Sequence, residues 1–257
     1  MKWPKHITII RHGQSEYNLL HDRKRKDPDY QRFKIAYEAD YQSIPTRDWA
    51  RSMRERYVLP YSDDKTPLTE LGMEQARLTA KNISTQIAPP DVIIHSPYLR
   101  VVQTLQEMKT GWPDLAKVPA VSDDRIREQE HGLALLYNDW RIFHVCHPEQ
   151  KRLLDLVGPY WYRYPQGESA AEVCGQRIGQ MFDMLIREYA GKDVWLIAHH
   201  LTILEARVKM ERLSPEEFIR LDEEEKPVNC GVTRYACNPE LGKDGKMELE
   251  FYNRSFC

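Results

Sequence analysis

The residues with the clearest chemical potential stand where a short apolar segment ends. Arg11 and His12 follow the apolar run Ile7–Ile10, and Gly13 then lets the chain turn. A cation and an imidazole at the carboxyl end of a strand lie at the edge where open α/β sheets bind their ligands. Such a pair can bind an anion through the guanidinium and attack it through a ring nitrogen.

Three later segments repeat this arrangement. Predicted strands lie at residues 91–95, 118–121 and 194–198, and the chemically active residues that follow them are Arg100, Glu128 and His199. If these strands are parallel, their carboxyl ends meet at one edge of the sheet. Two histidines, two arginines and one carboxylate would then gather there. This set fits transfer of a phosphoryl group through a histidine, because that reaction depends mainly on positioning and on neutralising charge.

In its motifs the chain resembles the histidine phosphatase superfamily, also called the phosphoglycerate mutase-like family. The resemblance runs from about residue 7 to residue 233. The matching residues, in chain order, are Arg11-His12-Gly13-Gln14-Ser15 with Asn18, Leu68-Thr69 with Gly72 and Gln75-Ala76, Ser96-Pro97 with Arg100 and Gln103-Thr104, Glu128 with Gly132, Gly167-Glu168-Ser169, and His199. Each motif is short, but their joint occurrence in order is specific.

The resemblance implies catalytic roles for five residues. His12 would be the nucleophile that forms a phosphohistidine, and Glu128 would protonate the leaving alkoxide and later take a proton from water. Arg11, Arg100 and His199 would bind the charged phosphate oxygens, for which the planar guanidinium is well shaped. Glu128 is favoured over its neighbour Glu130 by the family's Glu-x-x-x-Gly spacing.

Three further residues are expected to bind substrate. Asn18 and Gln14 follow the first motif, and His200 stands where the family usually has a glycine. The larger imidazole of His200 either narrows the pocket or adds a contact to the substrate. The chain has no His-Glu-x-x-His motif, so we expect no metal ion and no other cofactor.

The order of predicted elements indicates an α/β fold. Alternating helices and apolar strands predict a three-layer sandwich, in which helices cover both faces of a largely parallel central sheet. A long helix is expected from Ser169 to about Tyr189, and residues 231–237 and 247–252 are expected to form a hairpin.

Two long stretches, residues 19–63 and 133–166, interrupt this alternation. We expect a single domain over residues 1–257, in which these two insertions cover the active site. The basic run at residues 23–26 is interpreted as a solvated face of the surface.

Composition excludes several classes of protein. The net charge of the 257 residues is -2, so nucleic acid and membrane surfaces are not expected partners. No apolar stretch is long enough to span a bilayer, and the N-terminal residues lack the pattern of a secretory signal. The five cysteines are scattered without a Cys-x-x-Cys pair, which favours a reducing, cytoplasmic setting. The oligomeric state is left open.

These observations predict a metal-independent phosphomonoesterase acting on a small phosphorylated molecule. One alternative is a 2,3-bisphosphoglycerate-dependent phosphoglycerate mutase. Mutases of the family carry an adjacent arginine pair after the catalytic glutamate, and here that region has only Trp140-Arg141 and Lys151-Arg152. The other alternative is an inactive module that binds a phosphorylated ligand. It is disfavoured because both His12 and Glu128 are present.

Overall fold

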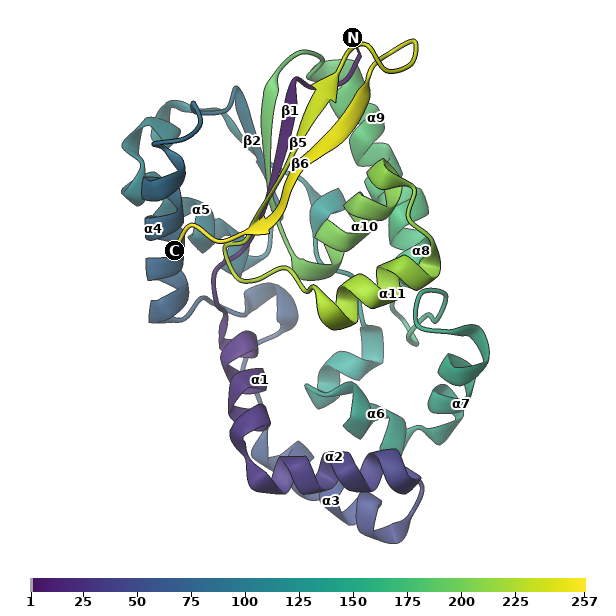
Figure 1. Cartoon of the computed structure of the whole chain (residues 1–257). Helices are drawn as coiled ribbons and strands as arrows, with labels where there is room; N and C mark the ends of the chain where they lie inside the picture. Colours follow the sequence, from purple (N-terminus) through teal and green to yellow (C-terminus); the bar gives the residue numbers. More distant parts are fainter. Residues whose placement is uncertain (1) are drawn as a thin grey trace. The chain divides into compact units, whose positions relative to one another are not determined.

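The computed structural model describes residues 2–257, which divide into two compact units (Figure 1). The first unit contains the chain up to Ser15 together with Asp64–Glu128 and Glu172–Cys257. The second unit contains Glu16–Asp63 and Gln129–Ala171, close to the two stretches that the sequence sets apart as insertions. That these segments cover an active site stays a prediction.

A six-stranded sheet forms the centre of the first unit, with strand order β3-β2-β4-β1-β5-β6. The strands are β1 (His6–Arg11), β2 (Val92–His95), β3 (Ala120–Ser122), β4 (Asp193–Ala198), β5 (Val232–Asn238) and β6 (Lys246–Arg254). The first four are parallel, and β5 and β6 form the expected antiparallel hairpin beside β1. The largely parallel sheet is therefore confirmed.

Helices cover both faces of this sheet (Figure 1). They are needed on both faces because apolar side chains of the strands point alternately to one face and the other. The helices of the first unit that follow its strands are α4 (Glu70–Ile83), α5 (Leu99–Gly111), α9 (Gly179–Glu188), α10 (His200–Glu211) and α11 (Pro215–Glu224). In β1, Ile7 and Ile9 share one hydrophobic cluster with α9 and α10, whereas Ile10 shares another with α4 and α5. Successive strand residues point to opposite faces, and the predicted three-layer sandwich results.

The predicted long helix from Ser169 to about Tyr189 is confirmed, since helical residues run without a break from Ala170 to Glu188. It is not α-helical throughout, because a π-helical turn at Cys174–Ile178 separates α8 (Ala170–Val173) from α9. Gly175 and Gly179 lie in and directly after this turn. Glycine weakens a regular α-helix by about 1 kcal/mol relative to alanine, and π turns occur often at functional sites.

The second unit is helical and has a core of its own. Its helices are α1 (Glu16–Lys26), α2 (Pro28–Asp40), α3 (Ile44–Arg56), α6 (Trp140–Cys146) and α7 (Pro148–Val157). Phe33, Met53 and Ile142 are fully buried in one cluster that joins α2, α3 and α6. Both insertions therefore contribute to a single packed core.

The interpretation of residues 23–26 as a solvated face is wrong for Lys24. Its side chain is buried, and Nζ donates to Asp139 Oδ2 at 3.1 Å. The Tyr30 hydroxyl donates to the same carboxylate. Leu20, four residues earlier on α1, is also buried, so Lys24 lies on the inner face of its helix. Burial lowers the pKa of Lys24, while the adjacent Asp139 opposes that shift.

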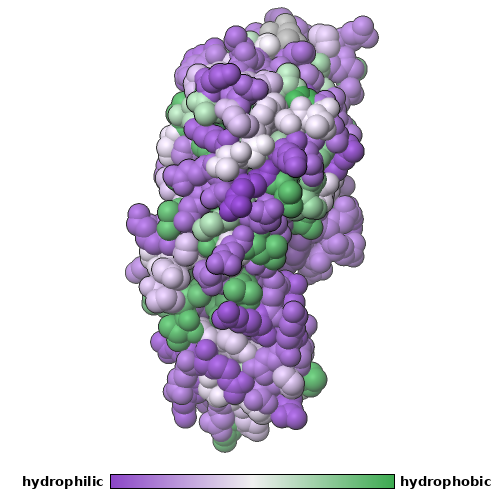
Figure 2. Space-filling model, turned by 90° about the vertical axis from the view of Figure 1, so that its left-hand side faces the viewer, coloured by the Kyte–Doolittle hydropathy of each residue, from purple (hydrophilic) through white to green (hydrophobic). Residues whose placement is uncertain are grey.

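The molecular surface is polar over most of the face drawn in Figure 2, with only small apolar patches. Within residues 2–257, no helix has the length and apolar character needed to cross a membrane.

Candidate functional site

The predicted site begins where β1 ends. Arg11 is opposite Ala198 of β4, and His95 of β2 is opposite Ile197. The carboxyl ends of the three neighbouring strands are therefore level. The backbone N–H of His12 donates to the carbonyl of Ala198 at 3.1 Å, which holds His12 at this edge.

The imidazole of His12 is held in one tautomer. Its Nδ1 lies 2.7 Å from the carbonyl oxygen of Gly13. A carbonyl only accepts hydrogen bonds, so Nδ1 must carry a proton, and in the neutral ring Nε2 then carries the lone pair. The N–H of Gly13 in turn donates to Thr104 Oγ1 at 3.0 Å, and Thr104 Oγ1 donates to the carbonyl of Arg100. The ring of His12 is therefore oriented through α5.

The surroundings of His12 favour the neutral ring. Burial lowers its pKa well below the ordinary value, and the positive charges of Arg100 and Arg11 lower it further. A neutral imidazole with a free electron pair on Nε2 is the form that attacks phosphorus. The two arginines that would bind a phosphate thus also favour the unprotonated ring of His12.

Close backbone contact fixes the turn after His12. A Cβ atom on Gly13 would lie 2.3 Å from the carbonyl oxygen of Gly72, so any side chain there would force the two segments apart. Gln14 continues this contact: its N–H donates to Gln75 Oε1 at 2.9 Å, and its Oε1 accepts from the hydroxyl of Thr69 at 2.9 Å. The side chain of Gln14, predicted to bind substrate, is thus engaged with the start of α4.

The two arginines reach this edge from different elements. Arg11 Nη1 donates to the carbonyl of Pro227 at 2.6 Å, in the loop before β5. Arg100 lies in the first turn of α5, is buried, and places its guanidinium carbon 4.9 Å from the centre of the Tyr98 ring. The Tyr98 ring also lies 5.1 Å from the His199 ring, measured between centroids.

His199 stands directly after β4 and beside His12. The centroids of the two imidazole rings are 5.2 Å apart. His199 Nε2 lies 2.8 Å from Ser96 Oγ, and its ring is fully buried. Burial lowers the pKa of His199 well below the ordinary value, with further lowering by Arg100 and His12. A phosphate dianion would oppose these repulsions and favour the protonated ring.

Glu128 is the last residue of the first unit before the chain enters the second. The backbone around it is held by Arg177, which donates to the carbonyls of Arg125, Arg127 and Glu128. Glu130, its neighbour in sequence, belongs to the second unit, where its N–H donates to Glu168 Oε2 at 3.1 Å. The two acids therefore belong to different units.

The other two predicted substrate contacts have different settings. Asn18 lies in α1 of the second unit, so its contact with a phosphate bound at His12 stays a prediction. His200 is the first residue of α10, and its Nε2 lies 2.7 Å from Asp222 Oδ1 of α11. Its role as a substrate ligand also stays a prediction.

Sequence reasoning missed several residues of this site. Ser96 and Thr104 occur in the family motifs, but the motifs do not indicate what their hydroxyls bind. The hydroxyl of Ser96 lies beside His199, and that of Thr104 accepts from the N–H of Gly13. Tyr98 lies between them in sequence and packs against both Arg100 and His199. Arg177 had no sequence signal, because its three partners lie about fifty residues earlier in the chain.

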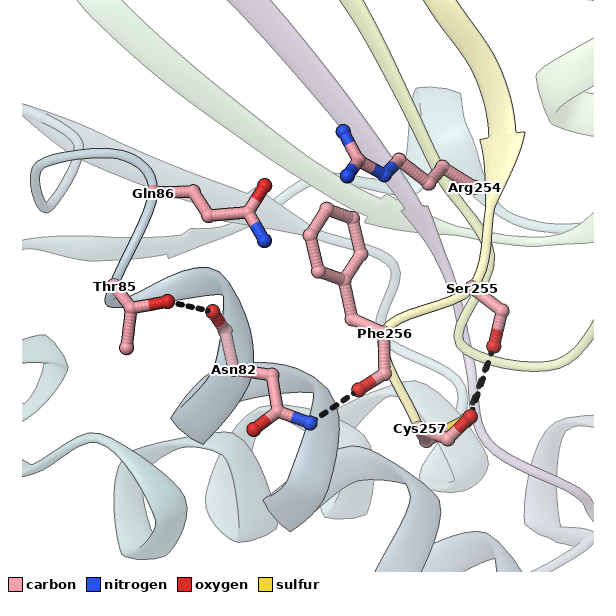
Figure 3. Close-up of a pocket in the computed structure, with 7 residues that line it drawn as sticks. All are labelled: Asn82, Thr85, Gln86, Arg254, Ser255, Phe256 and Cys257. Atoms are coloured by element: carbon pink, nitrogen blue, oxygen red, sulfur yellow. Dashed lines mark hydrogen bonds between the residues drawn. The ribbon is translucent and has the colours of Figure 1, made fainter.

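A separate pocket lies at the end of α4. Figure 3 shows its seven lining residues, which are Asn82, Thr85, Gln86, Arg254, Ser255, Phe256 and Cys257. Asn82 Nδ2 donates to the carbonyl of Phe256 at 2.6 Å across it. None of the predicted catalytic or substrate-binding residues lines this pocket. In residues 2–257, no three His, Cys, Asp or Glu side chains are grouped so that they could hold a metal ion.

Comparison with solved structures supports the fold. A mycobacterial glucosyl-3-phosphoglycerate phosphatase, in complex with VO3, matches with a TM-score of 0.64 and 18% identity over 98% of this chain and all of the other. A phosphoserine phosphatase from Entamoeba histolytica, in complex with 3-phosphoglyceric acid, matches with a TM-score of 0.62 and 17% identity over 97% of this chain and 96% of the other. At these identities the similarity concerns the fold alone.

Comparison of sequences identifies the family. Phosphoglycerate mutase-like protein AT74H of Arabidopsis thaliana is 27% identical over 97% of this chain and 79% of its own length. The model of the histidine phosphatase superfamily (branch 1) matches residues 52–243, which include Arg100, Glu128 and His199. The chain therefore belongs to the histidine phosphatase superfamily.

Proposed function

We propose that this protein is a phosphomonoesterase that acts through a phosphohistidine on His12. The observation that carries the proposal is the bond from His12 Nδ1 to the carbonyl of Gly13, beside Arg11 and Arg100. It leaves the Nε2 lone pair available for attack, and the two guanidinium groups supply the charge that a phosphomonoester requires.

The reaction divides into two displacements. In the first, His12 Nε2 attacks phosphorus, the ester P–O bond breaks, and Glu128 gives its proton to the departing alkoxide. In the second, a water molecule attacks the phosphohistidine, Glu128 accepts a proton from it, and the P–N bond breaks to release inorganic phosphate. Arg11, Arg100 and a protonated His199 bind the phosphoryl oxygens in both steps.

The nucleophile is tested by replacing His12 with alanine. Turnover of a phosphomonoester should fall by at least about 10³-fold, as expected when a covalent nucleophile is lost. The wild-type enzyme should yield an acid-labile, alkali-stable phosphoprotein when quenched during turnover. His6→Ala is the matched control, because His6 lies at the other end of β1. Wild-type rates in His12→Ala would refute the nucleophile.

The acid is tested with Glu128→Gln, which keeps the shape of the side chain and removes the proton. General acid catalysis contributes about 10²–10⁴-fold. The kcat/KM for alkyl phosphates, which reports the first displacement, should therefore fall strongly, and that for p-nitrophenyl phosphate should fall much less, since its leaving group needs little protonation. Equal losses on both substrates, or a larger loss in Glu130→Gln, would assign the acid elsewhere.

A second candidate function is phosphoglycerate mutase, which the name of the Arabidopsis relative favours. The solved phosphatases of the same fold favour hydrolysis instead. The two are separated by incubation with 3-phosphoglycerate, with and without 2,3-bisphosphoglycerate. A phosphatase releases phosphate from a suitable monoester without the bisphosphate. Isomerisation to 2-phosphoglycerate that requires the bisphosphate, with negligible hydrolysis, would establish the mutase.

A further inference from the structure

One arginine from the π-helical turn makes three contacts with the loop that carries Glu128. Arg177 Nη1 lies 2.9 Å from the carbonyl oxygen of Arg125 and 3.1 Å from that of Arg127, and its Nη2 lies 3.4 Å from that of Glu128. A single guanidinium thus binds main-chain carbonyls both before Glu128 and at Glu128 itself. Its planar fork can hold several acceptors at once, which an ammonium group does less well.

Irregular backbone carries Glu128, and just beyond it the N–H of Glu168 donates to the carbonyl of Glu130 at 2.8 Å. A short 3₁₀ turn ends at Ile126, and residues 127–131 belong to no helix or strand. Besides Arg177, the hydroxyl of Thr202 donates to the carbonyl of Arg127 at 2.9 Å. Thr202 lies in the first turn of α10, three residues after His199. The backbone of Glu128 is therefore tied to the same helix start that presents His199.

The contacts that Arg177 and Thr202 make with this loop form a clamp, and its location has a consequence for catalysis. Glu128 is the residue at which the chain leaves the unit that contains His12. Arg177 and Thr202 belong to that unit, so their bonds fix the approach of the acid relative to His12 and His199.

We infer that Arg177 is a positioning residue for Glu128, and that it sets the efficiency of proton donation to the leaving group. The inference rests on the proposed role of Glu128 as the general acid. A displacement of about 1 Å in a catalytic group can cost about 10²-fold in rate. Weakening the clamp should therefore impair the step that needs the acid and spare the attack by His12.

The test compares two substrates in Arg177→Met, which keeps the aliphatic stem and removes the donors. We expect kcat/KM, which reports the first displacement, to fall by about 10²-fold for an alkyl phosphate and by less than about 3-fold for p-nitrophenyl phosphate. The inhibition constant of inorganic phosphate should change little, because phosphate binding is left to Arg11 and Arg100. Arg177→Lys should recover part of the lost alkyl phosphatase activity.

Arg125→Met is the matched control, because it removes another arginine of the same loop whose bonds go to Asp123 and to the carbonyl of Gln180. It should not discriminate between the two substrates. If Arg177→Met does not fold, Thr202→Val tests the same clamp through the carbonyl of Arg127, with the same selective loss expected. A loss of equal size on both substrates in either clamp variant, or a rise in the inhibition constant of inorganic phosphate alone, would overturn the inference.

A double-mutant cycle separates this inference from the function on which it rests. If Arg177 acts through Glu128, adding Arg177→Met to Glu128→Gln should change the alkyl phosphatase rate by less than about 3-fold, far from additivity. Fully additive losses would refute the positioning role and leave the acid in place. If Glu128→Gln alone lowers kcat/KM equally for both substrates, the proposed role of Glu128 as the acid is refuted instead.

Discussion

At the residue scale, burial controls the charge of three histidines. Burial is the largest cause of the lowered pKa of His12, His199 and His144. For the first two, this keeps a neutral ring ready for a phosphate. His144 lies in the core of the second unit, where it stacks on Tyr164 with an angle of 5° between the rings, and its pKa is lowered to about 4.

His144 should make the protein less stable in mild acid. A histidine whose pKa is lowered in the folded state binds more protons when unfolded, so its contribution is complete above its ordinary pKa of about 6.5 and is lost as the pH falls toward 4. Between pH 7.5 and pH 5.0 the free energy of unfolding should drop by about 2 kcal/mol through this residue. Urea denaturation at the two pH values measures the drop.

His144→Phe provides the comparison. The phenyl ring keeps the stacking on Tyr164 but cannot titrate, and Tyr37 loses its partner at 3.3 Å. The variant should be about 1 kcal/mol less stable at pH 7.5, and its pH-dependent drop should be about 2 kcal/mol smaller than that of the wild type. An identical pH dependence in the two proteins would show that His144 does not titrate as described.

At the element scale, the β5–β6 hairpin supports the sheet edge that carries Arg11. Asn253 of β6 accepts from the N–H of Val228 at 2.7 Å and donates to the carbonyl of Lys226 at 2.9 Å. The carbonyl of Pro227, between them, accepts from Arg11. Asn253 has a φ of 52°, a left-handed conformation that asparagine tolerates better than most residues. One side chain of an edge strand thus holds the loop that orients Arg11.

Asn253→Gly should weaken the binding of phosphate. Glycine tolerates the positive φ, so the variant removes the two hydrogen bonds without adding backbone strain. We expect inhibition by inorganic phosphate to weaken by about 10-fold, equivalent to about 1.4 kcal/mol. Asn238→Gly, at the far end of the same hairpin, is the control, because its amide donates to Glu248. Equal inhibition constants in wild type and Asn253→Gly would show that Asn253 does not affect phosphate binding through Arg11.

At the scale of the whole molecule, the proposed chemistry is carried by one of the two units. His12, Glu128, Arg11, Arg100 and His199 all belong to the first unit, although three separate segments of the chain contribute to it. The net charge of the molecule is only -2, so the attraction of an anionic substrate depends on these local cations and not on an overall positive field.

In the proposed reaction arginine and histidine supply the charge that neutralises the phosphate, so hydrolysis should not depend on a divalent ion. Activity toward a phosphomonoester should be unchanged after incubation with excess EDTA and desalting. The measurement should be repeated after adding back Mg²⁺ or Zn²⁺, with no gain expected. Activity that disappears with the chelator and returns with one of these ions would require a metal in the reaction.

The sequence alone determined the features that depend on neighbouring residues. The run Ile7–Ile10 indicates a buried strand and places Arg11 and His12 at its end, whatever the rest of the chain does. The β5–β6 hairpin was equally predictable, since an apolar alternation and a glycine-containing turn lie side by side in the chain. Together with the family motifs, these local signals were sufficient for the fold class.

Only the tertiary structure decided how the site residues are held. The bonds of Arg177 to the Glu128 loop, of Asn253 to the loop beside Arg11, and of Lys24 to Asp139 join residues that are far apart in sequence or have no motif. From the sequence alone a charged side chain is predicted to be solvated, because charged residues are rarely buried. The partner of a buried charged side chain depends on which elements pack against it. That packing is decided by the free energy of the whole core.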